Sequence, residues 1–250
     1  STLQDTETYL VGGVVRDAIL GRDSHDVDLV TMRSGLQVAR EIANHLVGDY
    51  YALDAERQVG RAIISVEDVR YVIDVASVRG DSIEDDLRLR DFTINAILVN
   101  PTHLDRIYDP LEGYDDLVTR RRLKECSTKS IADDPVRGLR AIRLSRQFGL
   151  RMEHSLQIAI RRYGPLLRTE DGVLAQPERV RDEMVKVLSL TDTSRVLRVM
   201  DMLGILAVCL PAHWDNPDQF EGRLLIMDAL GSLFSVISRS RDDNTASKLL

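Results

Sequence analysis

The sequence predicts an α+β fold, in which a head that mixes strands and helices is followed by an all-helical remainder. Short β-branched and apolar runs alternate with helical patterns over about the first 110 residues. After Gly113 only helical periodicity recurs. With 250 residues and 44% hydrophobic side chains, the chain is long enough for one large domain or for two to three small ones.

The head is expected to begin with a strand over 9–11, the Gly12-Gly13 pair, and a helix over 14–20 that Gly21 terminates. Apolar and β-branched runs predict further strands over 27–31, 50–53, 61–66 and 71–75. Helical spacing predicts helices over 36–46, 83–90 and 92–98 in the head. In the remainder it predicts helices over 135–147, 156–162, 177–188 and 194–203, and a weaker one over 224–234.

The formal net charge of −7 hides an asymmetry along the chain. Residues 120–168 carry thirteen Lys and Arg against four Asp and Glu, and Arg supplies most of the cations. Because guanidinium groups suit phosphates and base edges, this segment could present a track for a polyanion beside an acidic metal site. Helices covered with exposed charge would produce the same count, and the count alone favours neither interpretation.

The sequence predicts neither a membrane span nor a signal peptide nor a zinc site. No apolar run approaches the roughly 20 residues that a span needs, and residues 1–8 are polar. The two cysteines, Cys126 and Cys209, and the five histidines lack metal-ligand spacing. These observations predict a cytoplasmic protein with no membrane partner and no structural zinc.

Asp26 and Asp28 are the first candidates for catalytic chemistry. On a β-strand their carboxylates point to one face, whereas Val27 and Leu29 point into the core. Mg²⁺ takes one or two carboxylates together with phosphate oxygens and water, so the pair suits a nucleotide-metal site. Surface strands and turns often carry such a pair, so it is a weak signal alone.

Gly12 and Gly13 precede the first predicted helix and strengthen that interpretation. Glycine lets backbone N–H groups approach a phosphate at the positive end of a helix, and Arg16 could reach a triphosphate from the first turns. For an isolated pair, a tight turn without a ligand is the alternative.

Three segments carry a resemblance to a known family. Residues 10–21 (LVGGVVRDAILG), followed by Asp26-Val27-Asp28, resemble the first motif of class II tRNA nucleotidyltransferases and bacterial poly(A) polymerases. Residues 90–96 (RDFTINA) resemble the family's second block, whose arginine and aspartate meet the ribose and phosphates of the nucleotide. Residues 133–143 (DDPVRGLRAIR) resemble the block that reads the incoming base. Beyond Arg151 the similarity is generic.

The resemblance implies a polymerase-beta-like nucleotidyltransferase head with a mixed sheet over residues 1–122. It further implies a neck with the base-reading helix over 123–188 and a helical body over 189–250. Family members often carry more helical tail, which leaves open whether the chain is truncated after Leu250. The nucleotide-binding residues implied by the three segments are Gly12, Gly13, Arg16, Arg90, Asp91, Asn95, Asp134, Arg137, Arg140 and Arg143.

The third segment also makes physical sense by itself. Asp134 suits the N-cap of a helix that begins at Pro135, and Arg137 lies three residues on, hence on the same face. A carboxylate and a guanidinium together could accept C and A while rejecting U and G. Arg140 and Arg143 continue the same arc and could hold phosphates or RNA backbone. Taken alone, a capped helix with solvated arginines is the alternative.

Asp74 is the candidate for a third metal-binding carboxylate. It lies within an apolar predicted strand, where an acid is costly without a charge partner, and this position fits the family's next active-site strand. Asp85 and Asp86 are expected instead to lie on a helix surface or to orient neighbouring groups.

The segment after Asp74 departs from the family pattern. In CCA-adding enzymes a flexible loop separates the strand of the third acid from the Arg-Asp block, whereas here the chain runs through Gly80 almost directly into the next helix. In the family that loop is associated with addition of the terminal A. Its absence resembles CC-adding enzymes. Residues 50–59 also lack the extra signature of bacterial poly(A) polymerases.

Together with the resemblance, the sequence predicts addition of CMP, with AMP as a further candidate, to the 3′ end of tRNA by two-metal phosphoryl transfer. Asp26, Asp28 and Asp74 would hold Mg²⁺, CTP would be a substrate with ATP as a further candidate, and the helical part would hold the tRNA acceptor end by backbone and shape. Four alternatives remain open: a CCA-adding or A-adding enzyme, a poly(A) polymerase, an RNA-binding module that has lost catalysis, and an unrelated α+β domain.

Overall fold

The computed structural model of the chain describes residues 8–190, 192–210, 222, 224 and 225. It divides into two compact units, unit 1 over residues 1–130 and unit 2 over residues 131–250. The predicted helix over 224–234 lies outside the described residues apart from 224 and 225. The division into head, neck and body stays a prediction.

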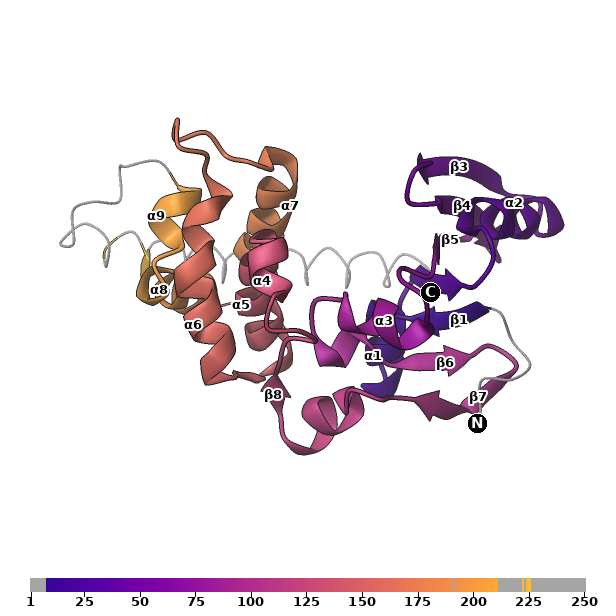
Figure 1. Cartoon of the computed structure of the whole chain (residues 1–250), viewed down its shortest axis with the longest axis horizontal. Coiled ribbons are helices and arrows are strands. Elements are labelled where there is room, and N and C mark those ends of the chain that lie inside the picture. The colour runs from indigo at the N-terminus through magenta and orange to yellow at the C-terminus, as the bar shows by residue number, and fades with distance from the viewer. Residues whose placement is uncertain (1–7, 191, 211–221, 223, 226–250) are drawn as a thin grey trace, which may run out of the picture. The chain divides into compact units, whose positions relative to one another are not determined.

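Unit 1 is built on a seven-stranded mixed sheet with the order β3-β4-β5-β2-β1-β6-β7 (Figure 1). Its strands are β1 (Thr8–Val11), β2 (Asp26–Thr31), β3 (Asp49–Asp54), β4 (Val59–Val66), β5 (Val69–Ser77), β6 (Leu98–Asn100) and β7 (His103–Tyr108). β2 and β5 are parallel, and the other neighbouring pairs are antiparallel. The α+β class predicted for the head is confirmed.

Helices cover separate parts of this sheet. They are α1 (Gly13–Ile19), α2 (Gly35–His45) and α3 (Ile83–Arg88), with the 3-10 turn η1 (Thr93–Asn95), the π-helical turn η2 (Asp115–Thr119) and the short strand β8 (Arg122–Leu123) further along. Val38 and Ala39 of α2 pack against Ala62 and Ile73 of β4 and β5. A second apolar cluster joins α3 to β1 and β2. The burial of these two apolar clusters holds in place the strands that carry Asp28 and Asp74.

Unit 2 is mainly helical. Its elements are α4 (Ser130–Asp133), α5 (Val136–Phe148), β9 (Arg151–Met152), α6 (His154–Tyr163), η3 (Gly164–Leu167), α7 (Pro177–Leu188), α8 (Thr193–Met202) and α9 (Leu206–Cys209). α5 packs against both α7 and α8, and Leu139 and Ile142 on it are buried. Gly149 ends α5 in the left-handed conformation with φ 62°. The predicted helices over 135–147, 156–162, 177–188 and 194–203 are confirmed.

One predicted helix is wrong. Residues 92–98 form the turn η1 and then enter strand β6. Every residue from 91 to 99 is buried, so the run has no polar face by which a helical period could be recognised. The following strand β7 was not predicted, because nearly all of its side chains are exposed and its apolar residues do not alternate.

No helix among the described residues combines the length and apolar character needed to cross a membrane.

Candidate active site

Three carboxylates lie on one face of the sheet in unit 1. In β2, the exposed Asp26 and Asp28 alternate with the partly buried Val27 and Leu29. Asp28 is the in-register partner of Asp74 on the parallel neighbour β5. In-register residues on adjacent strands share a face, as do residues two apart on one strand. The parallel pairing thus brings together the two sequence segments that were predicted to supply the metal ligands.

Arg61 adds a cation to this cluster. It is the antiparallel partner of Asp74, and its Nε and Nη2 donate to Asp74 Oδ1 and Oδ2 at 2.6 and 2.8 Å. The bond to Asp74 raises the pKa of Arg61 above its usual value, and the charges of Asp26 and Asp28 raise the pKa further. Sequence reasoning missed Arg61. The only available signal was its position across the β4–β5 hairpin from a strand-borne acid.

The residues fit Mg²⁺ through Asp26 and Asp28. Two exposed carboxylates on one strand face match the one or two protein ligands that Mg²⁺ takes beside phosphate oxygens and water. Both oxygens of Asp74 are bound by Arg61 instead. Within the described part of the chain, no three His, Cys, Asp or Glu side chains are grouped so that they could hold one metal ion. Asp74 as a metal ligand therefore stays a prediction.

Gly12 places the backbone that begins α1 against Asp28. It has φ 79° and ψ −144°, a conformation that favours glycine. A Cβ at this position would lie 2.7 Å from Asp28 Oδ2, and one at Gly13 would lie 3.4 Å from Arg16 Nη2. Both predicted glycines thus stand where the chain passes close to a predicted site side chain.

A buried polar network joins the first motif to the second. Arg16, which is 7% exposed, donates from Nε and Nη2 to Asp17 and from Nη1 to Asn95 Oδ1 at 2.7 Å. Asn95 Nδ2 in turn donates to Asp91 Oδ1, which also accepts the backbone N–H of Phe92. Arg16, Asn95 and Asp91, predicted from separate segments, form one hydrogen-bonded chain.

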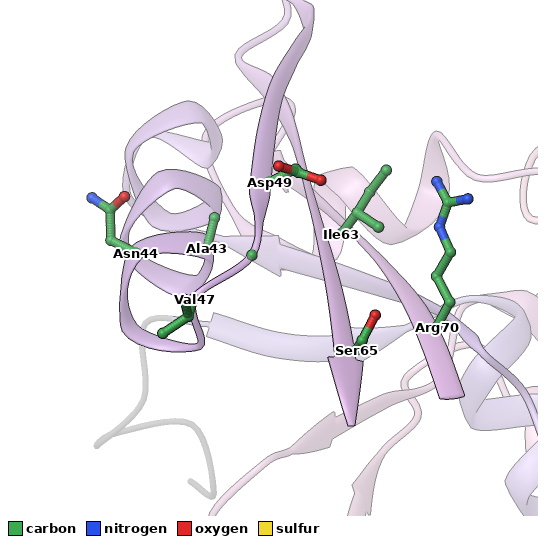
Figure 2. Close-up of a pocket in the computed structure, with 8 residues that line it drawn as sticks. Ala43, Asn44, Val47, Asp49, Ile63, Ser65 and Arg70 are labelled. Atoms are coloured by element: carbon green, nitrogen blue, oxygen red, sulfur yellow. The ribbon is translucent and has the colours of Figure 1, made fainter. Parts of the chain in front are cut away.

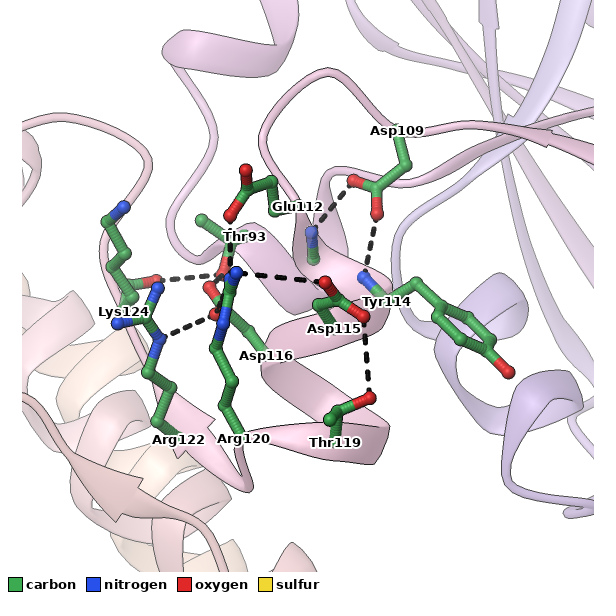
Figure 3. Close-up of polar contacts among 11 residues, drawn as sticks. Thr93, Asp109, Glu112, Tyr114, Asp115, Asp116, Thr119, Arg120, Arg122 and Lys124 are labelled. Atoms are coloured by element: carbon green, nitrogen blue, oxygen red, sulfur yellow. Dashed lines mark hydrogen bonds and ion pairs between the residues drawn. The ribbon is translucent and has the colours of Figure 1, made fainter.

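Asp116 also binds the second block, through Thr93. This fully buried carboxylate accepts from Thr93 Oγ1 at 2.8 Å, from Arg122 Nε at 2.6 Å and from Arg120 Nη1 at 3.2 Å (Figure 3). A buried carboxylate with two charged donors is well compensated, so it holds its partners in fixed orientations. Thr93 is thereby fixed two residues after Asp91. Sequence reasoning did not identify this cluster.

The connection between β5 and α3 comprises residues 78–82 and is as short as predicted.

Asp86 in α3 is 1% exposed, so its expected surface position is wrong. The expected orienting role is supported, because Asp86 is bound by both Arg79 and Arg90.

In unit 2 the predicted base-reading residues lie at the start of α5. Asp134 Oδ1 accepts the backbone N–H of Val136 at 3.3 Å. The predicted N-cap is wrong by one residue, because α5 begins at Val136 and Pro135 is its N-cap. Asp134 Oδ2 lies 3.6 Å from Arg137 Nε. Arg179 at the start of α7 donates to both oxygens, at 3.2 and 2.6 Å. Arg179 was missed by sequence reasoning, and it orients the carboxylate that was predicted to read the base.

The other two arginines of this segment differ in their surroundings. Arg140 is partly buried. Arg143 is 9% exposed and donates to both carboxylate oxygens of Glu183 on α7, at 2.7 and 3.3 Å, and to Gln147. In this structure Arg143 joins two helices, and its predicted contact with phosphates stays a prediction.

An open groove of about 770 Å³ lies between the end of α2 and the strands β3, β4 and β5 (Figure 2). Asn44, Asp49, Ser65 and Arg70 contribute its polar side chains. None of the predicted site residues lines it. The predicted residues instead form one group in unit 1, around Asp28 and Arg16, and a second group in unit 2, around Asp134.

Comparison with known proteins supports the same family for both units. Residues 8–123 match the model of the poly A polymerase head domain. Residues 149–216 match the model described as the probable RNA and SrmB-binding site of polymerase A.

Two curated relatives illustrate the range of named activities. A CC-adding tRNA nucleotidyltransferase of Geobacter sulfurreducens is 36% identical over 89% of this chain and 50% of its own length. An A-adding tRNA nucleotidyltransferase of Deinococcus radiodurans is 35% identical over 81% of this chain and 44% of its own length. The chain thus spans about half the length of the curated relatives that it matches.

Solved structures agree. The Thermotoga maritima CCA-adding enzyme complexed with tRNA-CCA superposes with a TM-score of 0.71 and 29% identity over 86% of this chain and 50% of that one. Two family models in sequence order, the relatives and the fold lead to one conclusion. The chain belongs to the tRNA nucleotidyltransferase/poly(A) polymerase family.

Proposed function

We propose that this chain adds nucleotides, without a template, to the 3′ end of tRNA. The observation that carries the proposal is the pair of exposed carboxylates, Asp26 and Asp28, on one strand face, with Gly12 in close approach to Asp28. The proposal is further supported by two relatives of the chain that are named as tRNA nucleotidyltransferases.

The residues of unit 1 would position the reacting phosphate. Mg²⁺ held by Asp26 and Asp28 would stabilise charge on the α-phosphate and lower the pKa of the RNA 3′-hydroxyl. Arg16 is already fixed by Asp17 and Asn95, so its guanidinium needs little reorganisation to meet a triphosphate. Arg90 and Asp91 would bind the ribose and phosphates.

Unit 2 would choose the base and hold the RNA. The Asp134 carboxylate accepts from an exocyclic amine, and the Arg137 guanidinium donates to a ring acceptor, which selects C and A over U and G. Arg179 fixes Asp134 through two hydrogen bonds. Arg140 and the exposed arginines of α6 would meet the RNA backbone by charge rather than by sequence.

Within this function we infer a preference for stopping after two cytidines. The support is the short connection over residues 78–82 and the 36% identity to a protein named as CC-adding. Relatives named as A-adding and CCA-adding are 35% and 30% identical, so the same scaffold accommodates the alternatives.

The deciding experiment is an extension assay with tRNAs that end before the CCA sequence, after C and after CC. Each is incubated with Mg²⁺ and labelled CTP or ATP. We expect CMP to be added to the first two substrates and no efficient addition of AMP to the third. Efficient AMP addition to the CC-ending tRNA would contradict the CC-only preference. No addition to any of them would contradict the proposed activity.

Replacing both Asp26 and Asp28 with Ala tests the alternative of a binding module. We expect incorporation to be abolished while tRNA binding, measured by filter retention, stays within about threefold of the wild type. Persisting incorporation would contradict the metal assignment.

A further inference from the structure

Asp86 receives two arginines from different parts of unit 1. It lies on α3 and its side chain is 2% exposed. Arg79, from the connection between β5 and α3, donates to Asp86 Oδ1 from Nε at 2.7 Å and from its backbone N–H at 3.3 Å. Arg90 donates to Oδ2 from Nε at 3.0 Å, with Nη2 at 2.9 Å from the same oxygen. Each carboxylate oxygen therefore serves one arginine.

The position of Asp86 is itself strongly determined. Ser82 caps the start of α3, and Ile83 and Leu87, three residues before Asp86 and one after it, are buried against β1 and β2. Because α3 is fixed at its start and along its apolar face, the Asp86 carboxylate cannot shift when the arginine side chains move. The partners must adopt the geometry that Asp86 provides.

Arg90 and Arg79 contact Asp86 in different ways. Arg90 is 17% exposed, and two of its nitrogens contact a single oxygen of Asp86, which restricts the guanidinium plane. Arg79 is 44% exposed and makes a further bond from Nη2 to the backbone oxygen of Asp86. Arg79 thus attaches the connection over 78–82 to α3, and Arg90 is the residue expected to meet the nucleotide.

We propose that Asp86 is a positioning residue that holds Arg90 ready for the sugar and phosphates of an incoming nucleoside triphosphate. Through Arg79 the same carboxylate ties the short connection to the nucleotide site. The inference deepens the proposed function and rests on it. Asp86 itself touches no substrate, and its contribution is to the affinity for the nucleotide.

Asp86→Asn tests this role, because it keeps the size of the side chain but removes its charge and places an amide N–H₂ against a guanidinium. We expect KM for CTP to rise about tenfold, the loss typical of one hydrogen bond to a charged group. We expect kcat to change by less than about threefold, since Arg90 acts in binding. Asp86→Glu, which restores the charge, should recover part of the affinity.

Two controls accompany this variant. Asp81→Asn removes an equal charge from an exposed residue of the same connection and should leave KM unchanged. Arg79→Gln removes one of the two arginines and leaves the Asp86–Arg90 contact in place, so KM should rise less than in Asp86→Asn.

Affinity for CTP, measured by calorimetry below the melting temperature of each variant, gives a readout independent of tRNA extension. A merely structural role for Asp86 would lower the active fraction, and hence kcat, with KM and the CTP affinity of the folded protein unchanged. That result would overturn the inference, as would equal effects of Asp86→Asn and Asp81→Asn. Failure of the wild-type protein to extend tRNA would contradict the proposed function alone, because the calorimetric comparison would still decide the role of Asp86.

Discussion

Gly12 combines a backbone conformation that favours glycine with close approach to the Asp28 carboxylate. Gly12→Ala would place a Cβ 2.7 Å from Asp28 Oδ2 at a φ of 79°. Either the helix start or the carboxylate must move, and a displacement of about 1 Å at a reacting centre costs about 100-fold in rate. We expect incorporation of CMP to fall by that factor, measured as kcat/KM with a tRNA that lacks its CCA end.

Gly21→Ala is the matched control for this substitution. Gly21 also has a positive φ, of 66°, but an added Cβ there would meet nothing within 4 Å. It should lose about 1 kcal/mol of stability, as expected for Ala in a left-handed conformation, with kcat/KM nearly unchanged. Similar kinetic losses in both variants would show that strain, and not the contact with Asp28, limits position 12.

Arg61 offers a second test at the level of single residues. Its guanidinium lies in the field of three carboxylates, so Arg61→Gln should leave the site more negative. We expect the Mg²⁺ concentration for half-maximal incorporation to fall about threefold, on the order of the interaction of two partly solvated charges. Arg70→Gln, an exposed change on β5, should leave the Mg²⁺ dependence unaltered. A higher Mg²⁺ requirement in Arg61→Gln would mean that Arg61 organises the ligands and does not compete with the metal.

The sequence could predict some of these residues and not others, for a physical reason. Asp26 and Asp28 lie two apart on one strand, so their shared face follows from the period of a strand alone. Arg61 lies beside Asp74 only because β4 pairs with β5, and Arg179 lies beside Asp134 only because α7 packs against α5. Contacts between distant segments leave no trace in local spacing.

Among the helices and strands, those with one buried and one exposed face were predictable from their periodicity. α2 and α7 are of this kind, and their observed bounds differ from the predicted ones by at most one residue. The segment over 92–98 is buried on all sides, and β7 is exposed on nearly all of its length. In both cases the sequence lacks the contrast between faces on which a periodic pattern depends.

The contact between α5 and α7 allows a prediction about stability. Glu183→Ala would leave the buried Arg143 guanidinium with Gln147 as a neutral partner. Removing one member of a buried ion pair typically costs about 3–5 kcal/mol of unfolding free energy. We expect a loss of that size in urea unfolding followed by circular dichroism.

Glu178→Ala, on the exposed face of the same helix, serves as the comparison and should stay within about 0.5 kcal/mol of the wild type. If the two variants unfold at the same urea concentration, the Arg143–Glu183 pair contributes no net stability, and Arg143 is retained for another reason.

For the whole molecule, the charge distribution predicts how RNA binding responds to salt. The net charge of −7 opposes binding of a polyanion, so attraction must come from locally exposed arginines such as Arg161 and Arg162 on α6. Replacing both with Gln should weaken tRNA binding and reduce the slope of log affinity against log salt concentration by about 2.

A matched pair of exposed arginines in unit 1, Arg57 and Arg106, provides the control. Changing these two to Gln alters the net charge equally and should leave the slope within about 0.5 of the wild type. Equal changes in both double variants would show that net charge, and not the basic segment, governs RNA binding.

The parallel pairing of β2 with β5 also has a consequence for the order of folding. β4 and β5 are joined by a tight turn at Glu67 and Asp68, both with positive φ, so this hairpin and its Arg61–Asp74 pair need only local chain closure. β2 and β5 are separated along the sequence by α2, β3 and β4, so their pairing is non-local, and non-local pairing forms slowly. We therefore expect the carboxylate cluster to be completed late, when Asp28 joins an acid that already has its arginine. A newly made chain would then lack the proposed metal site until its central sheet has closed.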